Sequence, residues 1–130
     1  MEHVSFTGPI YDFKAKMNAY ASCDVFVLPS SYEGTSQALF EAMSQAKPIV
    51  STKRGGIPYQ VSDGKEALLV EYNDSKALGK AILTLLDDKK LAEELGSCAH
   101  EKVKNFVYSK LVRQIEEIYL DALKENKRGM

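Results

Sequence analysis

The stretch from Asp24 to Val50 most constrains what this chain can fold into. It opens with a short apolar run, residues 25–28, which predicts a strand that is buried on both faces. A polar loop follows, and a helix is predicted from about Ser36 to Ala46, with Thr35 or Ser36 as its N-cap. Lys47-Pro48 ends that helix, because the residue before a proline is pushed out of the α region. The stretch therefore predicts a β-loop-α-β unit, and open α/β sheets bind ligands in such loops at the carboxyl ends of their strands.

Two carboxylates lie on either side of a predicted anion site, one in the loop of this unit and one in its helix. Glu33 lies just ahead of the predicted helix, and Glu41 follows after seven further residues. Between them lie residues whose backbone N–H groups reach the helix N-terminus, where anions bind: Gly34, Thr35, Ser36 and Gln37. This pattern suits a ligand with hydroxyls at both ends and phosphate in the middle, such as a nucleotide sugar. Two plainer interpretations stay open, namely that Glu41 is a solvated residue on the polar face of its helix and that Glu33 is an ordinary acidic residue near a positive helix end.

The rest of the chain predicts further elements of the same α/β kind. Strands are expected at residues 3–7, 49–52 and 67–71, a helix at 11–22 and a helical turn at 59–62. Lys53 to Pro58 form a loop, and its paired glycines suit a backbone with unusual φ and ψ or a close approach to a ligand. From Ser75 onward we expect helices with three apolar stripes that form core. The third stripe comprises Leu111, Val112, Ile115, Ile118, Tyr119 and Ala122.

Composition excludes several classes of function. The 130 residues are expected to form one domain, and the net charge of −1 does not favour nucleic acid or an anionic membrane. No apolar run approaches the roughly 20 residues of a membrane span, and we expect no signal peptide. The two cysteines, Cys23 and Cys98, lack metal-ligand spacing, so we interpret them as reduced and the protein as cytoplasmic. His3 and His100 are too few to indicate a metal site.

The segment PSSYEGTSQALFEAMSQAKPIVSTKRGG resembles the donor-binding core of the retaining GT-B glycosyltransferases of the group 1, or family 4, type. The matching pieces are Pro29-Ser30, Glu33-Gly34, Glu41-Ala42-Met43, Pro48-Ile49-Val50 and Gly55-Gly56, and the match extends to residues 4–8, 63–64 and 68–70. The resemblance implies an α/β fold with a parallel sheet of about four strands, Rossmann-like connectivity as in the GT-B C-terminal domain, and a helical C-terminus. Residues 1–126 would be a partial nucleotide-sugar-binding domain and residues 127–130 a frayed tail.

The resemblance also implies roles for particular residues. Glu33 would be the catalytic residue that binds the hydroxyls of the donor sugar and supports charge developing at its reacting face. Glu41 would accept hydrogen bonds from the ribose hydroxyls. Other residues would contact the donor through their backbones: the diphosphate or sugar would lie on Gly34, Thr35, Ser36 and Gln37, the nucleobase near Gly8 and Ile10, and the donor beside Gly55 and Gly56. The substrate would be a nucleotide diphosphate sugar, with no metal and no further cofactor.

Two parts of the family's enzymes have no counterpart in this chain. One is the acceptor-side domain, and the other is the first half of the donor domain, which supplies the family's Arg and Lys for the diphosphate. The first two strands of the family's donor domain would lie between the first and second strands of this chain. The sheet is therefore expected either to close in sequential order or to be completed by another chain, through a homodimer or a partner that supplies the missing half.

Three functional interpretations stay open at this stage. The chain is a donor-binding piece of a hexosyltransferase that is inactive in isolation, or it is a non-catalytic remnant held together by oligomerisation. A flavodoxin-like or receiver-type domain also fits the alternation of strands and helices, but it does not explain the paired glutamates or Gly55-Gly56. The base, the sugar and the acceptor cannot be deduced from the sequence.

Overall fold

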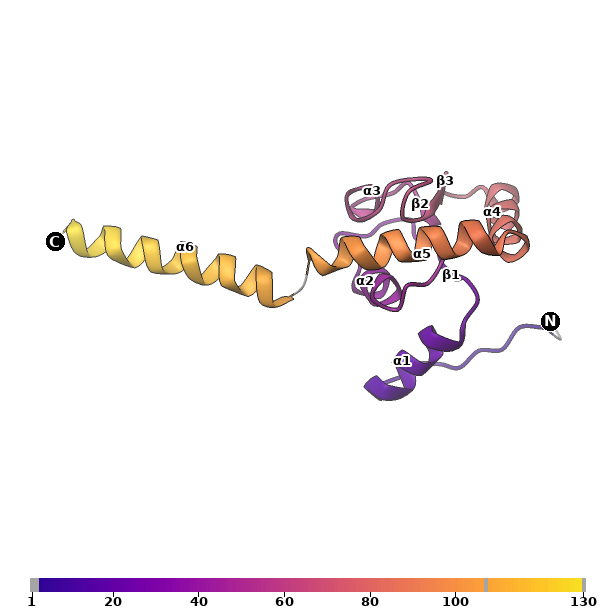
Figure 1. Ribbon diagram of the computed structural model, residues 1–130, viewed down its shortest axis with the longest axis horizontal. Helices are drawn as coiled ribbons and strands as arrows, with labels where there is room; N and C mark the ends of the chain where they lie inside the picture. Colours follow the sequence, from indigo (N-terminus) through magenta and orange to yellow (C-terminus); the bar gives the residue numbers. More distant parts are fainter. Residues whose placement is uncertain (1–2, 107, 130) are drawn as a thin grey trace.

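The structure, a computed structural model, describes residues 3–106 and 108–129 (Figure 1). The strands are β1 (Phe26–Leu28), β2 (Ile49–Thr52) and β3 (Leu68–Val70). The helices are α1 (Phe13–Ser22), α2 (Gln37–Ser44), α3 (Ile57–Gln60), α4 (Ser75–Asp87), α5 (Lys89–Lys104) and α6 (Tyr108–Arg128). Strands and helices alternate up to α4, and the C-terminal part is helical, which confirms the predicted α/β class.

The described strands form one parallel sheet in the order β1-β2-β3. Val50 of β2 is level with Val27 on one side and with Leu68 on the other, so β2 is the central strand. This sequential order is the first of the two arrangements expected for the sheet. The free side of β1 is one edge of the sheet and the free side of β3 is the other.

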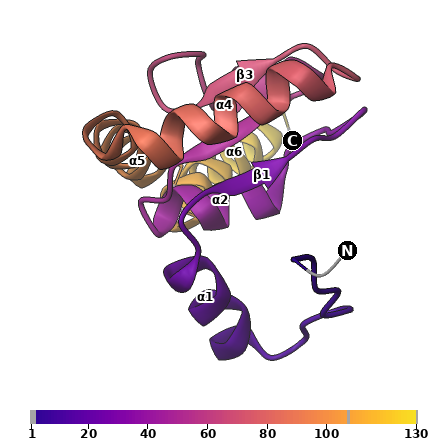
Figure 2. The ribbon, with the colours of Figure 1, turned by 90° about the vertical axis from the view of Figure 1, so that its right-hand side faces the viewer.

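Helices cover both faces of the sheet (Figure 2). On one face, Ile49 of β2 packs in a cluster with Leu39 and Met43 of α2. On the other face, Val50 packs in a second cluster with Leu85 of α4 and Leu95 of α5. Helix α5 also contributes Ala99 to the first cluster. Because successive residues of a strand point to opposite faces, the apolar pair at the start of β2 serves both layers.

The predicted strand at residues 3–7 does not form. The segment has no strand pairing, and its apolar side chains are exposed, Val4 to 55% and Phe6 to 84%. A strand needs a neighbour for its backbone hydrogen bonds and for one face of its side chains. Among the described residues, no strand of the sheet lies beside this segment, so it has nothing to pair with. The described part of the sheet therefore has three strands rather than about four.

The third apolar stripe is not core in the part of α6 that the structure describes. Helix α6 extends away from the rest of the molecule (Figure 1), and Ile115, Ile118 and Tyr119 are 57%, 70% and 64% exposed. The side chains of Leu111 and Val112 lie outside the described residues. The prediction fails because α2, α4 and α5 already cover the two faces of the sheet. Helix α6 continues through Lys127 and Arg128, two of the residues expected in a frayed tail.

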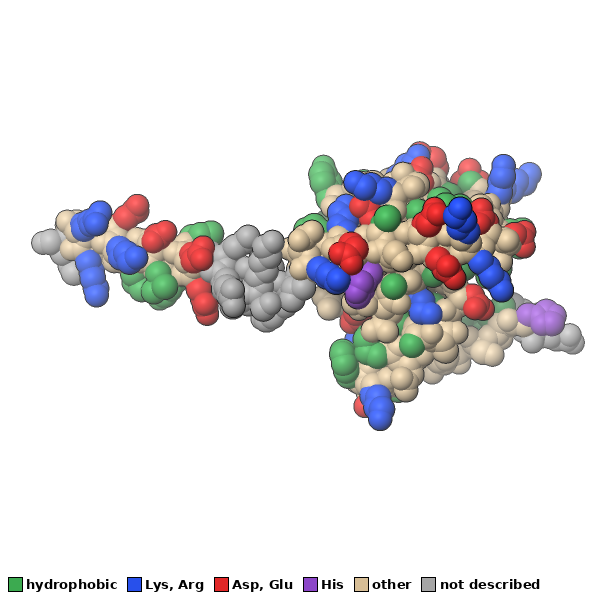
Figure 3. All heavy atoms as spheres, in the orientation of Figure 1, with side chains coloured by type: hydrophobic (Ala, Val, Ile, Leu, Met, Phe, Trp, Pro, Cys, Tyr) green, Lys and Arg blue, Asp and Glu red, His purple; other side chains and the backbone are tan. Residues whose placement is uncertain are grey.

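Charged side chains of both signs are interspersed on the face shown in Figure 3, in keeping with the near-neutral net charge. Among the described residues, no helix combines the length and the apolar character that a membrane crossing requires.

Two helical glycines provide a matched test of the packing of α5. A Cβ at Gly96 of α5 would collide with the carbonyl oxygen of Ala46, whereas a Cβ at Gly79 of α4 meets no atom within 4 Å. We expect Gly96→Ala to lower the free energy of unfolding by about 1–3 kcal/mol through overpacking. Gly79→Ala should raise it by about 0.5–1 kcal/mol, because alanine loses less entropy in a helix. Urea denaturation of both variants measures these free energies of unfolding. If Gly96→Ala were as stable as the wild-type protein, α5 would not lie against the turn before β2.

Candidate functional site

The loop that follows β1 carries Glu33 at the carboxyl end of the sheet. The Glu33 side chain is half-buried, and its Oε1 accepts a hydrogen bond of 2.9 Å from the hydroxyl of Ser30. Its main chain is held as well, because the N–H of Gly56 donates to the Glu33 carbonyl oxygen at 2.7 Å. The position of this carboxylate is therefore set jointly by the loops after β1 and after β2.

Gly55 and Gly56 allow these two loops to pack backbone on backbone. Gly55 has a φ of +54°, and a Cβ there would collide with the carbonyl oxygen of Glu33. A Cβ on Gly56 would collide with the carbonyl oxygen of Gly34. Both reasons given for the paired glycines thus apply, an unusual φ and a close approach, but the group approached is the Glu33 loop. Contact of these glycines with a ligand stays a prediction.

Ser36 caps α2 and is tied to α3 by a buried side chain. The Ser36 hydroxyl accepts from the N–H of Leu39 at 3.1 Å, as predicted for an N-cap. The Ser36 N–H donates to Oε1 of Gln60 at 2.8 Å, and Nε2 of Gln60 donates back to the Ser36 carbonyl at 3.0 Å. The Ser36 amide is therefore occupied, which corrects the prediction that it binds an anion. No sequence signal marked Gln60 for this role, because the pairing joins residues 24 positions apart.

The amides that remain at this helix N-terminus belong to residues on the surface. Gly34, Thr35 and Gln37 are exposed, and within residues 3–106 and 108–129 their backbone N–H groups make no hydrogen bond. Unpaired amides at the start of a helix can accept an anion. Of the four backbone amides predicted to bind phosphate, three therefore remain candidates.

Glu41 points from α2 toward α1 and is not simply solvated. Its Oε1 lies 3.0 Å from Nζ of Lys16, and its Oε2 accepts from the hydroxyl of Tyr20 at 2.9 Å. The pKa of Tyr20 is raised above its usual value, mainly by burial and secondly by the hydrogen bond to Glu41. A tyrosine hydroxyl with a raised pKa stays protonated, so it acts as a donor to the carboxylate throughout the neutral pH range.

Lys16 and Tyr20 are functional candidates that sequence analysis missed. The sequence predicted the helix at residues 11–22 that carries them, but neither side chain was named as a site residue. Their spacing of four residues places them on one side of α1. That spacing could have paired them, but nothing in the sequence shows that this side of α1 meets Glu41.

Gly8 and Ile10 line a groove of about 410 Å³ beside α1. Gly8 has a φ of +67°, and Ile10 is 39% exposed. The opposite wall of the groove comes from α1 and from the free edge of β1, and its residues include Lys16 and Tyr20. The groove thus brings the predicted nucleobase residues next to the two side chains that hold Glu41.

Two basic side chains of the loop after β2 contact neighbouring side chains. Lys53 lies 3.6 Å from the carboxylate of Glu71, and the Arg54 guanidinium stacks 4.6 Å from the ring centroid of Tyr72. The two predicted site glutamates share no hydrogen-bond partner among the described residues. The structure therefore arranges the candidates in two groups: the Glu33 loop with its glycines and amides, and Glu41 with α1 and the groove.

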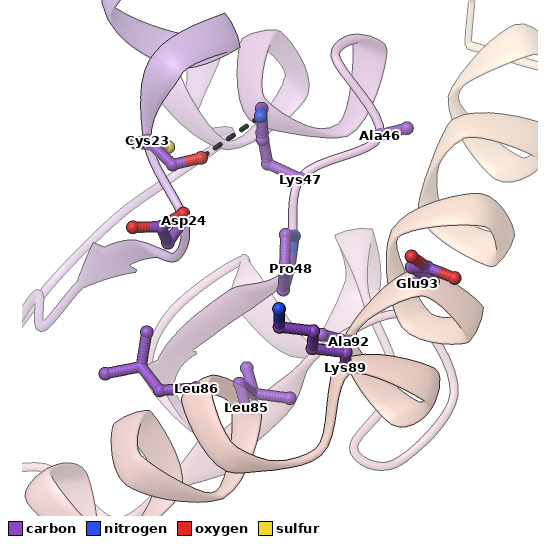
Figure 4. A pocket seen from close by; sticks show the side chains of 10 residues that line it. All are labelled: Cys23, Asp24, Ala46, Lys47, Pro48, Leu85, Leu86, Lys89, Ala92 and Glu93. Atoms are coloured by element: carbon purple, nitrogen blue, oxygen red, sulfur yellow. Dashed lines mark hydrogen bonds between the residues drawn. The ribbon is translucent and has the colours of Figure 1, made fainter.

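A hollow of about 530 Å³ lies at the opposite end of the sheet, where the strands begin (Figure 4). Of the two lysines that line it, Lys47 donates to the carbonyl oxygens of Ala21 at 2.7 Å and Cys23 at 3.1 Å, and so satisfies the C-terminal end of α1. Burial raises the pKa of the Cys23 thiol, which keeps it in the unreactive protonated form. No predicted site residue lines this hollow.

Comparison with known proteins gives consistent matches. The family described as "Glycosyl transferases group 1" matches residues 1–88. The D-inositol 3-phosphate glycosyltransferase of Corynebacterium diphtheriae is 31% identical over 106 residues, which are 82% of this chain and 25% of that protein. The sucrose-phosphate synthase of Thermosynechococcus elongatus matches with a TM-score of 0.89 and 30% identity, over 95% of this chain and 31% of that one. HepE of Anabaena, solved in complex with UDP, matches with a TM-score of 0.76 and 27% identity, over 79% of this chain and 29% of that one.

The chain therefore spans between a quarter and a third of the length of these proteins. The part that it covers is the region with the Glu33 loop, Glu41 and the paired glycines, carried on the parallel sheet of a GT-B domain. With the family match extending over more than half of its residues, the chain belongs to the group 1 glycosyl transferases, as part of a domain.

Proposed function

We propose that this chain is the donor-binding part of a retaining glycosyltransferase that transfers a hexose from a nucleotide diphosphate sugar. The observation that carries the proposal is the Glu33 loop. Its carboxylate, its glycines and its unpaired amides gather at the carboxyl end of the sheet, where α/β folds bind ligands. The UDP bound by HepE supports a uridine diphosphate sugar as one donor to test.

In the proposed complex each group of residues would meet one part of the donor. The unpaired amides of Gly34, Thr35 and Gln37 would hold the diphosphate, with Gly55 and Gly56 beside it. Glu33 would accept hydrogen bonds from the sugar hydroxyls, Glu41 would accept from the ribose, and the groove at Gly8 and Ile10 would hold the base. These roles are those that the family resemblance implies for these residues, and the arrangement of acceptors and donors is compatible with them.

The chemistry needs a prearranged electrostatic environment more than a reactive side chain. The bond from the anomeric carbon to the phosphate oxygen breaks, and a bond from that carbon to the acceptor hydroxyl oxygen forms. The hydroxyl proton goes to the departing diphosphate. Amides that are already oriented toward the diphosphate stabilise the negative charge that it gains, and the Glu33 carboxylate stabilises positive charge at the sugar.

The proposed activity needs parts that the described residues do not provide. We propose that the acceptor domain and the first half of the donor domain come from further polypeptide, and that this chain alone is inactive. A partner chain could supply these parts, whereas a homodimer could only complete the free edge of the sheet. Residues 1–126 would then be the partial donor domain. A cytoplasmic location suits the two unpaired thiols of Cys23 and Cys98.

A second candidate is a non-catalytic remnant of such a domain that oligomerises. It is favoured by the ion pairs of two basic side chains near the site, since Lys16 lies against Glu41 and Lys53 against Glu71. A diphosphate would then have amides but neither of these two lysines free of a carboxylate. Nucleotide binding by the isolated chain separates the two candidates.

The first test is calorimetric titration of the chain with UDP, GDP and their sugars, at a measured oligomeric state. If Glu41 accepts hydrogen bonds from ribose, Glu41→Ala should weaken nucleotide binding by about 1–3 kcal/mol. Glu94→Gln, which changes an exposed glutamate of α5, should leave the affinity unchanged and serves as the control. Absence of binding at millimolar nucleotide would favour the remnant, and wild-type affinity in Glu41→Ala would remove the ribose role of Glu41.

The second test concerns Glu33 and compares a nucleotide sugar with the bare nucleotide. Glu33→Gln keeps the size of the side chain but removes its charge. It should lower the affinity for the nucleotide sugar by about 1–2 kcal/mol, because only the sugar hydroxyls lose a charged acceptor. The affinity for UDP or GDP should not change. Equal losses of affinity for both ligands would indicate that the variant disturbs the loop and that Glu33 does not bind the sugar hydroxyls.

A further inference from the structure

The contacts of Glu41 point to a role for α1 that neither the sequence analysis nor the family match assigned. The Glu41 carboxylate receives one donor on each oxygen, Lys16 Nζ at 3.0 Å and the Tyr20 hydroxyl at 2.9 Å. Both donors come from α1, 25 and 21 residues earlier in the chain. We infer that Lys16 and Tyr20 are positioning residues that orient the Glu41 carboxylate for a ribose diol, an inference that rests on the proposed function.

The burial of Glu41 explains why it needs these donors. Its side chain is 14% exposed, whereas that of Lys16 is 37% exposed. A carboxylate that has lost most of its water must be compensated by hydrogen bonds or by charge. A donor on each oxygen also fixes the plane of the carboxylate, since rotation would break both contacts. Glu41 is thus held in one orientation by a cation and by a neutral hydroxyl.

The carboxylate still has acceptor capacity when both donors are in place. An ionised carboxylate offers about four lone-pair sites on its two oxygens, and the donors from α1 take two of them. One site per oxygen remains, which matches the two adjacent hydroxyls of a ribose. Lys16 and Tyr20 also line the groove that contains Gly8 and Ile10, so a nucleoside in this groove would contact the two side chains that hold the carboxylate.

A plain brace between α1 and α2 would produce the same contacts, so the test must measure more than stability. The useful quantity is the ratio of the affinities for UDP and for 2′,3′-dideoxy-UDP, which differ only in the ribose hydroxyls. A brace changes both affinities together or neither. Positioning of Glu41 changes the affinity for UDP and spares the affinity for the dideoxy compound.

We expect Lys16→Met and Tyr20→Phe each to lower this ratio by at least about fivefold, because a loosely held carboxylate forms weaker hydrogen bonds to the diol. Lys16→Arg keeps the charge and should restore most of the ratio. Lys14→Met changes an exposed lysine of the same helix and should leave the ratio at the wild-type value. Circular dichroism confirms that each variant is folded.

The outcomes separate this inference from the proposed function. A wild-type protein that prefers UDP, with the same preference in folded Lys16→Met and Tyr20→Phe, would overturn the inference and leave the nucleotide site intact. A ratio that rises in Lys16→Met would also overturn it, by showing that Lys16 competes with the ribose. A wild-type protein that binds neither compound would end the proposed function.

A measurement without ligand tests directly whether Lys16 and Tyr20 position the Glu41 side chain. NMR relaxation of the Glu41 side chain should show an ordered side chain in the wild-type protein and a mobile one in the Lys16→Met, Tyr20→Phe double variant. A mobile Glu41 side chain in the wild-type protein would overturn the inference, whether or not nucleotide binds.

Discussion

The burial of β2 between two layers of helices is the constraint on which the rest of the structure depends. Ile49 and Val50 point to opposite faces and are both fully buried, so α2 must lie on one side and α4 on the other. The second half of the strand is polar but buried too. Ser51 donates its hydroxyl to the Leu28 carbonyl at 2.8 Å, and Thr52 donates to the Ser30 carbonyl at 2.6 Å. A buried hydroxyl must find an acceptor, and these two hydroxyls tie the central strand to the end of β1 and its loop.

The same coupling between neighbouring chain segments builds the candidate site. Gly56 donates to the Glu33 carbonyl, and Gln60 makes two hydrogen bonds to the Ser36 backbone, so the segment after β2 supports the loop after β1 at two points. This support uses the Ser36 amide for structure and leaves the amides of Gly34, Thr35 and Gln37 for a ligand. The loop is therefore fixed by the segment after β2, and the three backbone amides that would bind a donor remain exposed.

The apolar residues left on the surface lie in segments that find no core among the described residues. Val4 and Phe6 at one end of the chain, and Ile118 and Tyr119 at the other, have strand-like or helical patterns but no core to join. Hydrophobic periodicity gives a segment one apolar face, but it does not supply the surface that buries that face. The chain spans between a quarter and a third of the length of the relatives that it matches.

The sequence by itself determined the class of the fold, the order of its elements from residue 13 onward, and the family. These features depend on local signals: an apolar run for β1, the Ser36 cap, the Lys47-Pro48 stop and the paired glycines. Only the tertiary structure decided that residues 3–7 stay unpaired, that Gln60 takes the Ser36 amide, and that Glu41 is held by Lys16 and Tyr20. Each of these depends on which surfaces meet across 20 or more residues of chain or on the absence of a neighbouring strand, and side-chain spacing within one element carries no information about either.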